Sequence, residues 1–266
     1  SLTVKANNGA VYFNKAVGSN GTALDQLTIE ANDTYLAANV KTMGDQTYHG
    51  PLWVGTWNGK TVHLVSDNGS IIFKDTVNDR NSWDEQNGWW AYDAPWLNAG
   101  SNSLSVSANN GIFFNKAVGG INPLNNLDVH GWAVAAANIE TNGYQNYHDD
   151  LWIGNINPEI TKIIRLTSNN ESIIFNGAVN DATCEGGCAG NNSLAVRANY
   201  DVYFNKAVGA LNPLNNLTVY GEANLAANVK TMGDQTYHGP LWVGTWNGKT
   251  VHLVSDNGSI IFKDTV

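Results

Sequence analysis

The chain has 266 residues, of which 42% are hydrophobic and 14% are charged, and its formal net charge is −9. This composition is too apolar for an intrinsically disordered protein. The acidic balance argues against a nucleic-acid partner, because too few Lys and Arg side chains remain to neutralise a run of phosphates. No stretch of the sequence approaches the roughly 18 consecutive apolar residues of a transmembrane helix, so we expect no membrane span.

Long internal repeats dominate the sequence. Residues 40–77 recur letter for letter as residues 229–266. An opening string recurs three times, as SLTVKANNGAVYFNKAVG from Ser1, SLSVSANNGIFFNKAVG from Ser103 and SLAVRANYDVYFNKAVG from Ser193. Self-similarity at a long period is typical of solenoids, propellers and tandem arrays. We therefore divide a single continuous body, 1–266, into the repeat units 1–102, 103–192 and 193–266.

Each unit contains a shorter repeat with the periodicity of strands. Residues 1–17 align with residues 61–77 as apolar-x-apolar, Asn-Gly, x-apolar-x-Phe and, after three residues, Val. Apolar residues at every second position indicate strands with one buried face. We interpret the Asn-Gly turns as corners within one coil, because the next partner of each strand recurs about 20 residues later. The pattern predicts an all-β fold, a right-handed parallel β-helix (β-solenoid) of about 12 coils.

The same alternation predicts which side chains form the buried column. Residues in phase with the recurring Phe should face inward, because successive side chains of a strand point to opposite faces. The neighbours of Ile174 and Phe175 are alternatives to those two residues. The predicted column is Leu2, Val4, Val11, Phe13, Val17, Leu64, Ile71, Phe73, Phe114, Ile174, Phe175 and Phe204.

Two irregular inserts, 78–102 and 180–192, interrupt the repeats. An aromatic loop such as the first insert can fold over the flank of the solenoid as a packed flap. It can also present a platform for a sugar or for a protein partner. Our candidate glycan or partner contacts are its aromatic residues Trp83, Trp89, Trp90, Tyr92 and Trp96.

Both cysteines lie in the second insert, as Cys184 and Cys188. The two glycines between them allow the Cα atoms to approach within about 4.4 to 6.8 Å, the range of a disulfide. A tetrahedral zinc site would need two further ligands nearby. We predict a disulfide, which persists outside the cytoplasm, and free thiols and metal binding are the alternatives.

Carboxylates recur at a spacing that could form a catalytic pair. Asp25, Asp45 and Asp67 follow one another at about one coil each and could stack as an acid and a base. Asn stands near the corresponding positions in other units, however, and exchange of Asn with Asp is typical of structural turns. We therefore expect a ladder of turns, and we predict that the chain is not an enzyme.

The histidines do not form an evident metal site. His49, His148 and His238 occupy equivalent positions in successive units, so they should lie too far apart to share one ion. His130 has no counterpart in the other units. The sequence therefore predicts no metal site and no cofactor.

Two of the repeated strings resemble a known group of bacterial proteins. GDQTYHGPLWVGTWNGKTVHLVSDNGSIIFKDTV and LTVKANNGAVYFNKAVG are similar to the repeats of filamentous haemagglutinin-like exoproteins, which share the frame G-x-Q-T-Y-x-G followed by G-x-I-x-F-x-x-x-V. The resemblance extends over all three units apart from the inserts. It implies a right-handed parallel β-helix, export through a dedicated outer-membrane partner, and a role as an adhesin or in surface structure. The amino-terminal secretion domain of that family is not in this sequence, and its 10 Trp residues exceed the usual number.

These features together favour a structural or adhesive role. We expect a repeat segment of a secreted bacterial protein, extracellular or on the cell surface. Its expected partners are copies of itself, stacked head to tail or laterally, or a glycan or protein on a host or neighbouring cell. No polar cap is evident at either end of the repeats, so either neighbouring sequence has been removed or chains stack into an extracellular filament. The alternative is a β-helical carbohydrate-active enzyme or a glycan-binding module.

Overall fold

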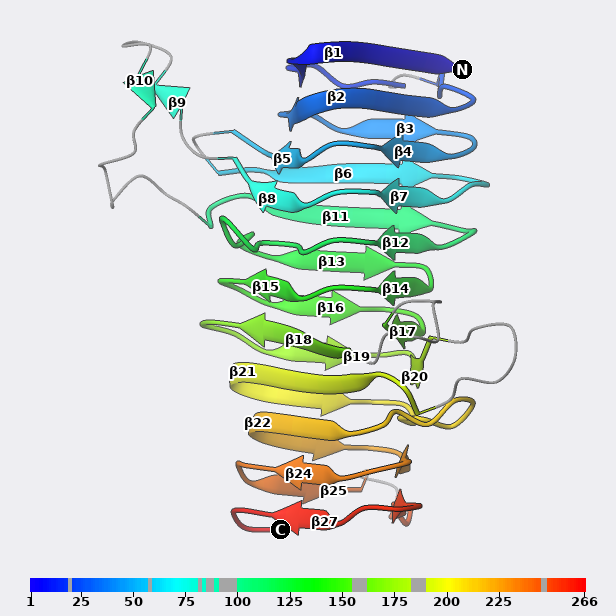
Figure 1. The fold of residues 1–266 in the computed structure, drawn as a ribbon, viewed down its shortest axis with the longest axis vertical. Coiled ribbons are helices and arrows are strands. Elements are labelled where there is room, and N and C mark those ends of the chain that lie inside the picture. The colour runs from blue at the N-terminus through cyan, green and yellow to red at the C-terminus, as the bar shows by residue number, and fades with distance from the viewer. Residues whose placement is uncertain are drawn as a thin grey trace.

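The computed structural model describes residues 1–18, 21–56, 59–80, 100–154, 162–182, 190–244 and 248–266, and the backbone of two short strands at 83–84 and 89–90. The described residues form strands joined by turns and bends, and none of them is helical. Parallel strands stack one above another along the body from the N-terminus to the C-terminus (Figure 1). The structure is therefore all-β and built from parallel sheets, as the alternating sequence predicts.

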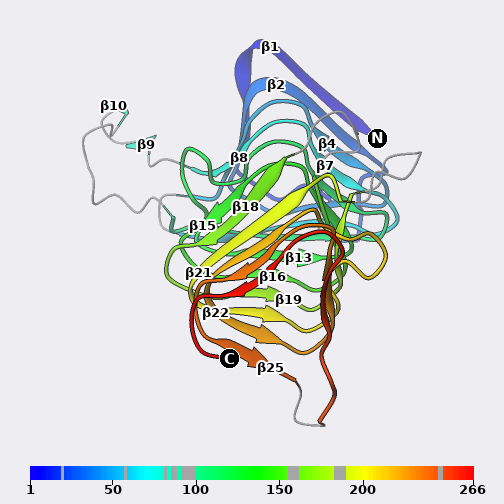
Figure 2. The same ribbon diagram turned by 60° about the horizontal axis from the view of Figure 1, so that its bottom comes forward.

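Three ladders of parallel strands form the walls of this body, and successive turns of the chain lie over one another (Figure 2). Val208 bridges β20 to β23 in the first ladder, and Val118 bridges β8 to β15 in the second.

The first ladder runs through β1 (Leu2–Phe13), β2 (Leu27–Leu36), β4 (Gln46–Tyr48), β7 (Ile71–Phe73), β12 (Ile112–Phe114), β14 (Ala133–Ala135), β17 (Leu151–Ile153), β20 (Val179–Asp181), β23 (Val229–Thr231) and β26 (Leu253–Ser255). The second starts in the C-terminal halves of β1 and β2 and continues through β5 (Leu52–Val54), β8 (Val77–Asp79), β15 (Ile139–Thr141), β18 (Ile163–Ser168), β21 (Ser193–Phe204), β22 (Leu217–Leu225), β24 (Gln235–Tyr237) and β27 (Ile260–Phe262). The third contains β3 (Val40–Thr42), β6 (Thr61–Ser66), β11 (Ser103–Ala108), β13 (Leu127–His130), β16 (Gln145–Tyr147), β19 (Ile173–Phe175), the C-terminal halves of β21 and β22, and β25 (Leu241–Val243). In the first insert, β9 (Trp83–Asp84) and β10 (Trp89–Trp90) form an antiparallel pair.

Coil length varies more than the sequence repeat suggests. Ala133 pairs with Leu151, 18 positions later. Val62 pairs with Leu104, 42 positions later, because the first insert lies between them. The walls therefore keep a common register while the corners absorb residues, so the repeat of about 20 residues is only an average.

The Asn-Gly pairs between β6 and β7, β11 and β12, and β26 and β27 are corners, as predicted. The flanking strands β6 and β7 do not pair with each other; each pairs in parallel with strands of neighbouring coils. At Gly69 the reason for glycine is space, since a Cβ there would lie 2.3 Å from the carbonyl carbon of Gly44 in the preceding coil. The pair at Asn8 differs, because β1 runs through it with a shift of register between Ala6 and Ala10.

The predicted buried column is confirmed in the interior of the body, with a neighbour in place of Ile174, and is wrong in the first coil. Leu64, Ile71, Phe73, Phe114, Phe175 and Phe204 are all at most 1% exposed. Ile174 points outward and its neighbour Ile173 is buried, because the two isoleucines alternate across the strand. The first coil is only partly buried, since no strand of the described residues pairs with its outer side. Leu2 is 38% exposed, and the half-buried residues are Val4, Val11, Phe13 and Val17.

The recurring Phe and Tyr side chains stack along the axis of the body. The rings of Tyr48 and Phe73 lie 5.5 Å apart, and those of Phe73 and Phe114 lie 5.2 Å apart. A second column joins Tyr147 and Phe175 at 5.4 Å. Each such contact contributes about 0.5 to 1.5 kcal/mol beyond the burial of apolar area. The core therefore continues from coil to coil without a break between the repeat units.

Candidate functional site

The Gly-x-Gln-Thr-Tyr string builds a buried corner. Gln46 Nε2 donates hydrogen bonds to Thr42 Oγ1 (3.2 Å) and to the carbonyl oxygen of Val65 (2.8 Å), and Tyr48 Oη donates to Gln46 Oε1 (3.0 Å). The same network recurs around Gln145 and Gln235. Burial raises the pKa of the Tyr48 hydroxyl, so it stays a neutral donor. The buried side chains of this string, Gln46 and Tyr48, therefore serve the fold.

A second recurring arrangement, a buried Asp hydrogen-bonded to an Asn, fixes the base of each insert. Asp79 is fully buried, and its Oδ2 accepts hydrogen bonds from the backbone amides of Gly100 and Ser101. Asn102 donates to the other oxygen of Asp79 and accepts from the amides of Thr56 and Lys60, both at 2.9 Å. The unfavourable burial of the carboxylate outweighs these hydrogen bonds and raises the pKa of Asp79 to about 6.

The second insert repeats this arrangement. Asn192 Nδ2 donates to Asp181 Oδ1 at 2.6 Å, and the amide of Asn191 donates to Asp181 Oδ2 at 2.8 Å. Burial also raises the pKa of Asp181. We call the two arrangements the Asp79 clamp and the Asp181 clamp. Each holds the two ends of an insert at a fixed place on the wall of the solenoid.

The predicted contacts in the inserts are not placed by the structure. Only the backbone of β9 and β10 is described in the aromatic loop, and the remaining predicted residues lie outside the described ranges. The glycan or partner contacts and the disulfide therefore stay predictions: Trp83, Trp89, Trp90, Tyr92, Trp96, Cys184 and Cys188.

The repeated carboxylates hold turns and ion pairs. Asp45 Oδ1 accepts a hydrogen bond from the backbone amide of Ser70 (2.8 Å), and Asp25 accepts one from the Ser1 hydroxyl (2.7 Å). Asp67 lies 3.0 Å from the ammonium group of Lys41. These contacts agree with the predicted ladder of turns, and the ion pair of Asp67 is a further contact that the sequence did not indicate.

An aromatic row lies on the flank of the N-terminal coils. The ring centroids of Tyr12 and Tyr35 are 4.9 Å apart, and those of Tyr35 and Trp53 are 6.3 Å apart, with the planes nearly parallel. Trp53 Nε1 donates to Asp33 Oδ1 (2.8 Å), and the guanidinium carbon of Arg80 lies 5.5 Å from the centroid of Tyr35. Tyr12 is 59% exposed. The side chains of this row pack mainly against one another, and the outer part of the Tyr12 side chain is exposed to solvent.

A charged cluster of the middle unit brings Asp128 together with two histidines. His130 Nε2 lies 2.8 Å from Asp128 Oδ2, and His148 Nε2 lies 2.9 Å from Asp128 Oδ1. The two imidazole rings stack with centroids 3.9 Å apart. Partial burial opposes ionisation of Asp128, but the hydrogen bonds and charges of both histidines outweigh it and lower the pKa of Asp128.

Sequence analysis missed this cluster because it compared histidines between units and not between coils. His130 and His148 are 18 positions apart, the same interval as between the paired residues Leu127 and Gln145 in this part of the ladder. That interval is the signal that could have placed the two rings side by side.

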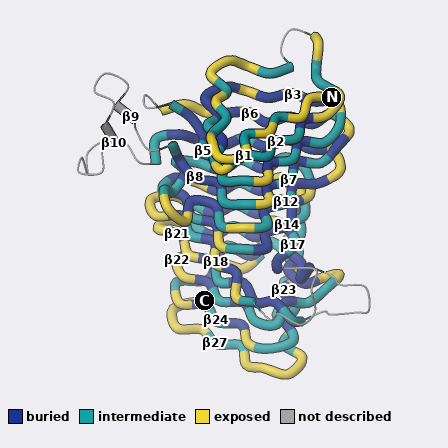
Figure 3. Tube along the Cα trace, turned by 45° about the horizontal axis from the view of Figure 1, so that its top comes forward, coloured by how far each residue is buried: buried dark blue, intermediate teal, exposed yellow. Residues whose placement is uncertain are grey.

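The two end coils of the body expose strand edges that are covered by a further coil in the interior. In the first copy of the identical sequence, β6 and β7 are covered by β11 and β12, and Phe73 is 1% exposed. In the second copy, no strand of the described residues lies beyond β26 and β27, and Phe262 is 43% exposed. Figure 3 shows exposed residues gathered along this last coil.

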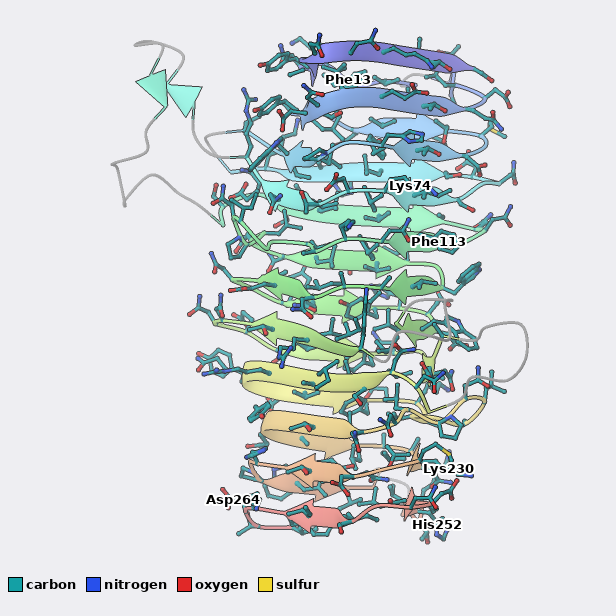
Figure 4. All side chains as sticks on the ribbon, in the orientation of Figure 1. Phe13, Lys74, Phe113, Lys230, His252 and Asp264 are labelled. Carbon is teal, nitrogen blue, oxygen red and sulfur yellow. The ribbon has the colours of Figure 1, made fainter. Side chains whose placement is uncertain are left out.

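At the opposite end of the body, the first coil is likewise more exposed than its counterparts in the interior. Leu2 is 38% exposed, whereas its counterparts Leu104 and Leu194 are at most 1% exposed in the interior. Phe13 lies at this end of the body and Asp264 lies in the last coil (Figure 4). We call the outer side of β1 the upper edge, and the outer side of β26 and β27 the lower edge.

Comparison with known proteins supplies no relative from which to infer a function: no family model, no curated protein and no solved structure matches the chain. Among the residues that the structure describes, no helix is long and apolar enough to cross a membrane.

Proposed function

We propose that the chain is a repeat segment of a secreted bacterial surface protein with an adhesive or structural role, and that its coils stack head to tail into an extracellular filament. The observation that carries this proposal is the complementarity of the upper and lower edges. The family resemblance supports export and an adhesive or structural role. The right-handed turn of the solenoid and its count of about 12 coils belong to the same proposal.

The chain contains two internal examples of the proposed contact. The coil that opens with Ser103 covers β6 and β7, placing Leu104 on Val62 and Phe114 on Phe73. The coil that opens with Ser193 covers β18 and β19 in the same way, and Phe204 lies on Phe175.

Applying this register to two chains places the upper edge of one on the lower edge of the other. Leu2 of one copy would lie on Val251 of the next, Val4 on Leu253 and Phe13 on Phe262. The contact buries the half-exposed apolar residues of both edges and continues the backbone ladders. It joins two different surfaces, so repetition produces a filament and not a closed dimer.

Charge sets the conditions for this assembly. Each chain carries a formal net charge of −9, and like charges repel when two chains approach. Salt screens charges separated by more than about 10 Å at 0.1 M ionic strength. The filament should therefore form more readily at physiological salt than at low salt.

The test is a mixing experiment with chains blocked at one end. Leu2→Asp places a charge on the upper edge and Phe262→Asp places one on the lower edge, while Leu211→Asp, at an exposed loop residue, is the control. Light scattering and negative-stain imaging should give concentration-dependent fibres for the wild type and the control, and monomers for each blocked chain alone. An equimolar mixture of the two blocked chains should form dimers. A wild-type monomer at all concentrations, or fibres from either blocked chain, would contradict the stacking.

A glycan-binding module is a second candidate, favoured by the aromatic row with its exposed Tyr12. Aromatic faces commonly bind sugar rings in shallow surface sites. Incubation with a polysaccharide panel, read out by affinity electrophoresis and by release of reducing ends, distinguishes the alternatives. Retention that Tyr12→Ala abolishes would support glycan binding, and reproducible turnover would support an enzyme in place of the proposed role.

A further inference from the structure

The Asp128 cluster presents three metal-binding groups at one point of the wall. One carboxylate oxygen of Asp128 and one ring nitrogen each of His130 and His148 lie within 4.8 Å of one another. Asp128 and His130 project from the same face of β13, because they are two residues apart on one strand. His148 follows β16, the strand that pairs with β13 in the next coil. Two adjacent coils thus supply the three side chains.

We propose that Asp128, His130 and His148 bind one divalent transition-metal ion. Two imidazoles and one carboxylate suit Zn²⁺, Ni²⁺ or Cu²⁺, whose bonds to His nitrogen and carboxylate oxygen are about 2.0 to 2.2 Å for Zn²⁺. Ca²⁺ and Mg²⁺ fit poorly, because they prefer oxygen ligands and this cluster offers one carboxylate. The ion would replace the protons through which the histidines bond to Asp128.

A row of asparagine side chains lies beside the cluster. Asn146 Nδ2 lies 2.8 Å from His148 Nε2, Asn176 Nδ2 donates to Asn146 Oδ1 (2.9 Å), and Asn205 Nδ2 donates to Asn176 Oδ1 (2.9 Å). The same Nε2 atom of His148 faces Asp128. The amide of Asn146 therefore competes with an ion for this nitrogen and must turn away when the ion binds.

The site is open to solvent on one side. The side chains of Asp128, His130 and His148 are 25%, 42% and 36% exposed. Small rotations of the two imidazoles can therefore bring the nitrogens and the oxygen to bonding distance around one ion without disturbing the core. Three protein ligands leave further coordination positions for water or for a group from another molecule.

The other two units provide natural controls, because they keep one histidine and lack its partners. The residues at the positions of Asp128, His130 and His148 are Thr28, Glu30 and His49 in the first unit, and Thr218, Tyr220 and His238 in the third. In the third unit the ring of Tyr220 stacks on His238, with centroids 4.4 Å apart. Only the middle unit therefore carries the complete set of ligands.

The first test is a titration of the untagged 266-residue chain with ZnCl₂, followed by isothermal calorimetry. We expect one equivalent of Zn²⁺ to bind to the cluster. His130→Ala and His148→Ala should each weaken this binding by at least about tenfold, whereas the matched variants His49→Ala and His238→Ala should leave it unchanged. No binding to the wild type, or an equal loss in all four variants, would overturn the proposal.

The second test transplants the site into the third unit. Thr218→Asp together with Tyr220→His recreates the full set around the existing His238. We expect the number of bound Zn²⁺ ions to rise from one to two, and binding of Co²⁺ to give visible absorption bands for both sites. All altered residues are on the outer face, so circular dichroism should show the wild-type strand content. A folded variant that still binds one ion would contradict the assignment of these three residues as the ligand set.

Discussion

Residues 40–77 and 229–266 have the same sequence and different surroundings, and the comparison shows what holds a coil together. In the first copy Val62, Leu64 and Ile71 are fully buried. In the second copy their counterparts Val251, Leu253 and Ile260 are only partly buried. Strands form in both copies, because each has a coil above it, but β26 has three residues where its counterpart β6 has six. Burial of the other side depends on the coil below, and the sequence of the segment itself does not determine it.

The largest expected difference between the two copies is in the loss of stability when the recurring Phe is replaced by Ala. Phe73→Ala should lower the free energy of unfolding by about 3 to 5 kcal/mol, because the side chain is packed between Tyr48 and Phe114 and a cavity would remain. Phe262→Ala should cost about 1 kcal/mol, because the ring is 43% exposed in the isolated chain. Urea denaturation at low protein concentration measures both values. Equal costs would mean that the two copies are equally covered.

The Asp79 clamp lies directly after the covered copy and should make the stability of the chain depend on pH. The folded pKa of Asp79 is about 6, above the unfolded value of 3.8, so the folded chain binds more protons between these values. The contribution of Asp79 to stability is therefore full below about pH 4 and is lost as the pH rises through 6. Relative to Asp79→Asn, the wild type should lose about 2 to 3 kcal/mol between pH 4 and 7.

The measurement is the free energy of unfolding of both proteins at half-unit steps of pH. Asp75→Asn is the control, because Asp75 lies near the clamp in sequence and its side chain accepts a hydrogen bond from the adjacent amide of Thr76. Parallel pH curves for the wild type and Asp79→Asn would show that the buried carboxylate does not titrate in this range.

The buried Gln corner should behave alike in both copies, because it depends on contacts that both retain. Gln46 and Gln235 are both fully buried and each bonds the tyrosine two residues on. Replacing either by Ala removes the hydrogen bonds to the buried tyrosine hydroxyl and to a backbone carbonyl, at a cost of about 2 kcal/mol. Thermal or urea unfolding of Gln46→Ala and Gln235→Ala should give similar losses. A much smaller loss at Gln235 would mean that the last coil is frayed.

The smallest effect is expected at the repeated surface ion pair. Lys41 lies 3.0 Å from Asp67, and Lys230 lies 3.1 Å from Asp256. Both pairs lie on the surface and are partly exposed, so Lys41→Ala and Lys230→Ala should each change the free energy of unfolding by less than about 0.5 kcal/mol. Raising the salt concentration should remove even this difference. A loss above 1 kcal/mol at either position would assign the pair a role in packing.

The fold could be predicted further than the site, because alternation and corner residues are local signals. Apolar residues at every second position and the Asn-Gly corners were sufficient for the strands, the parallel sheets and the interior Phe column. Ile173 and Ile174 could not be separated locally, since two adjacent isoleucines fit either phase. The exposure of Leu2 could not be predicted from its strand, since it depends on which coils lie on each side.

The clamps and the Asp128 cluster depend on contacts between coils. Asp79 meets Asn102 across an insert, and a signal for this contact was present: both inserts open with Asn-Asp and end with Gly-x-Asn. His130 meets His148 only because the coil between them has 18 residues. An average repeat of about 20 residues does not predict that His130 and His148 lie side by side. The exact length of each coil is therefore the information that sequence periodicity lacked.

Hydrogen exchange of the repeated peptide tests the central claim most directly. Residues 62–73 and 251–262 yield peptides of the same mass, so their exchange appears in one mass envelope. In the first copy the amide of Ile71 donates to Gly111 of the covering coil (3.0 Å). At low protein concentration we expect two populations of equal intensity, one slow and one fast. As the concentration rises, the fast population should become slow, because the lower edge is covered by the upper edge of another chain. A single envelope at low concentration, or a fast population that persists while the chains assemble, would contradict the account.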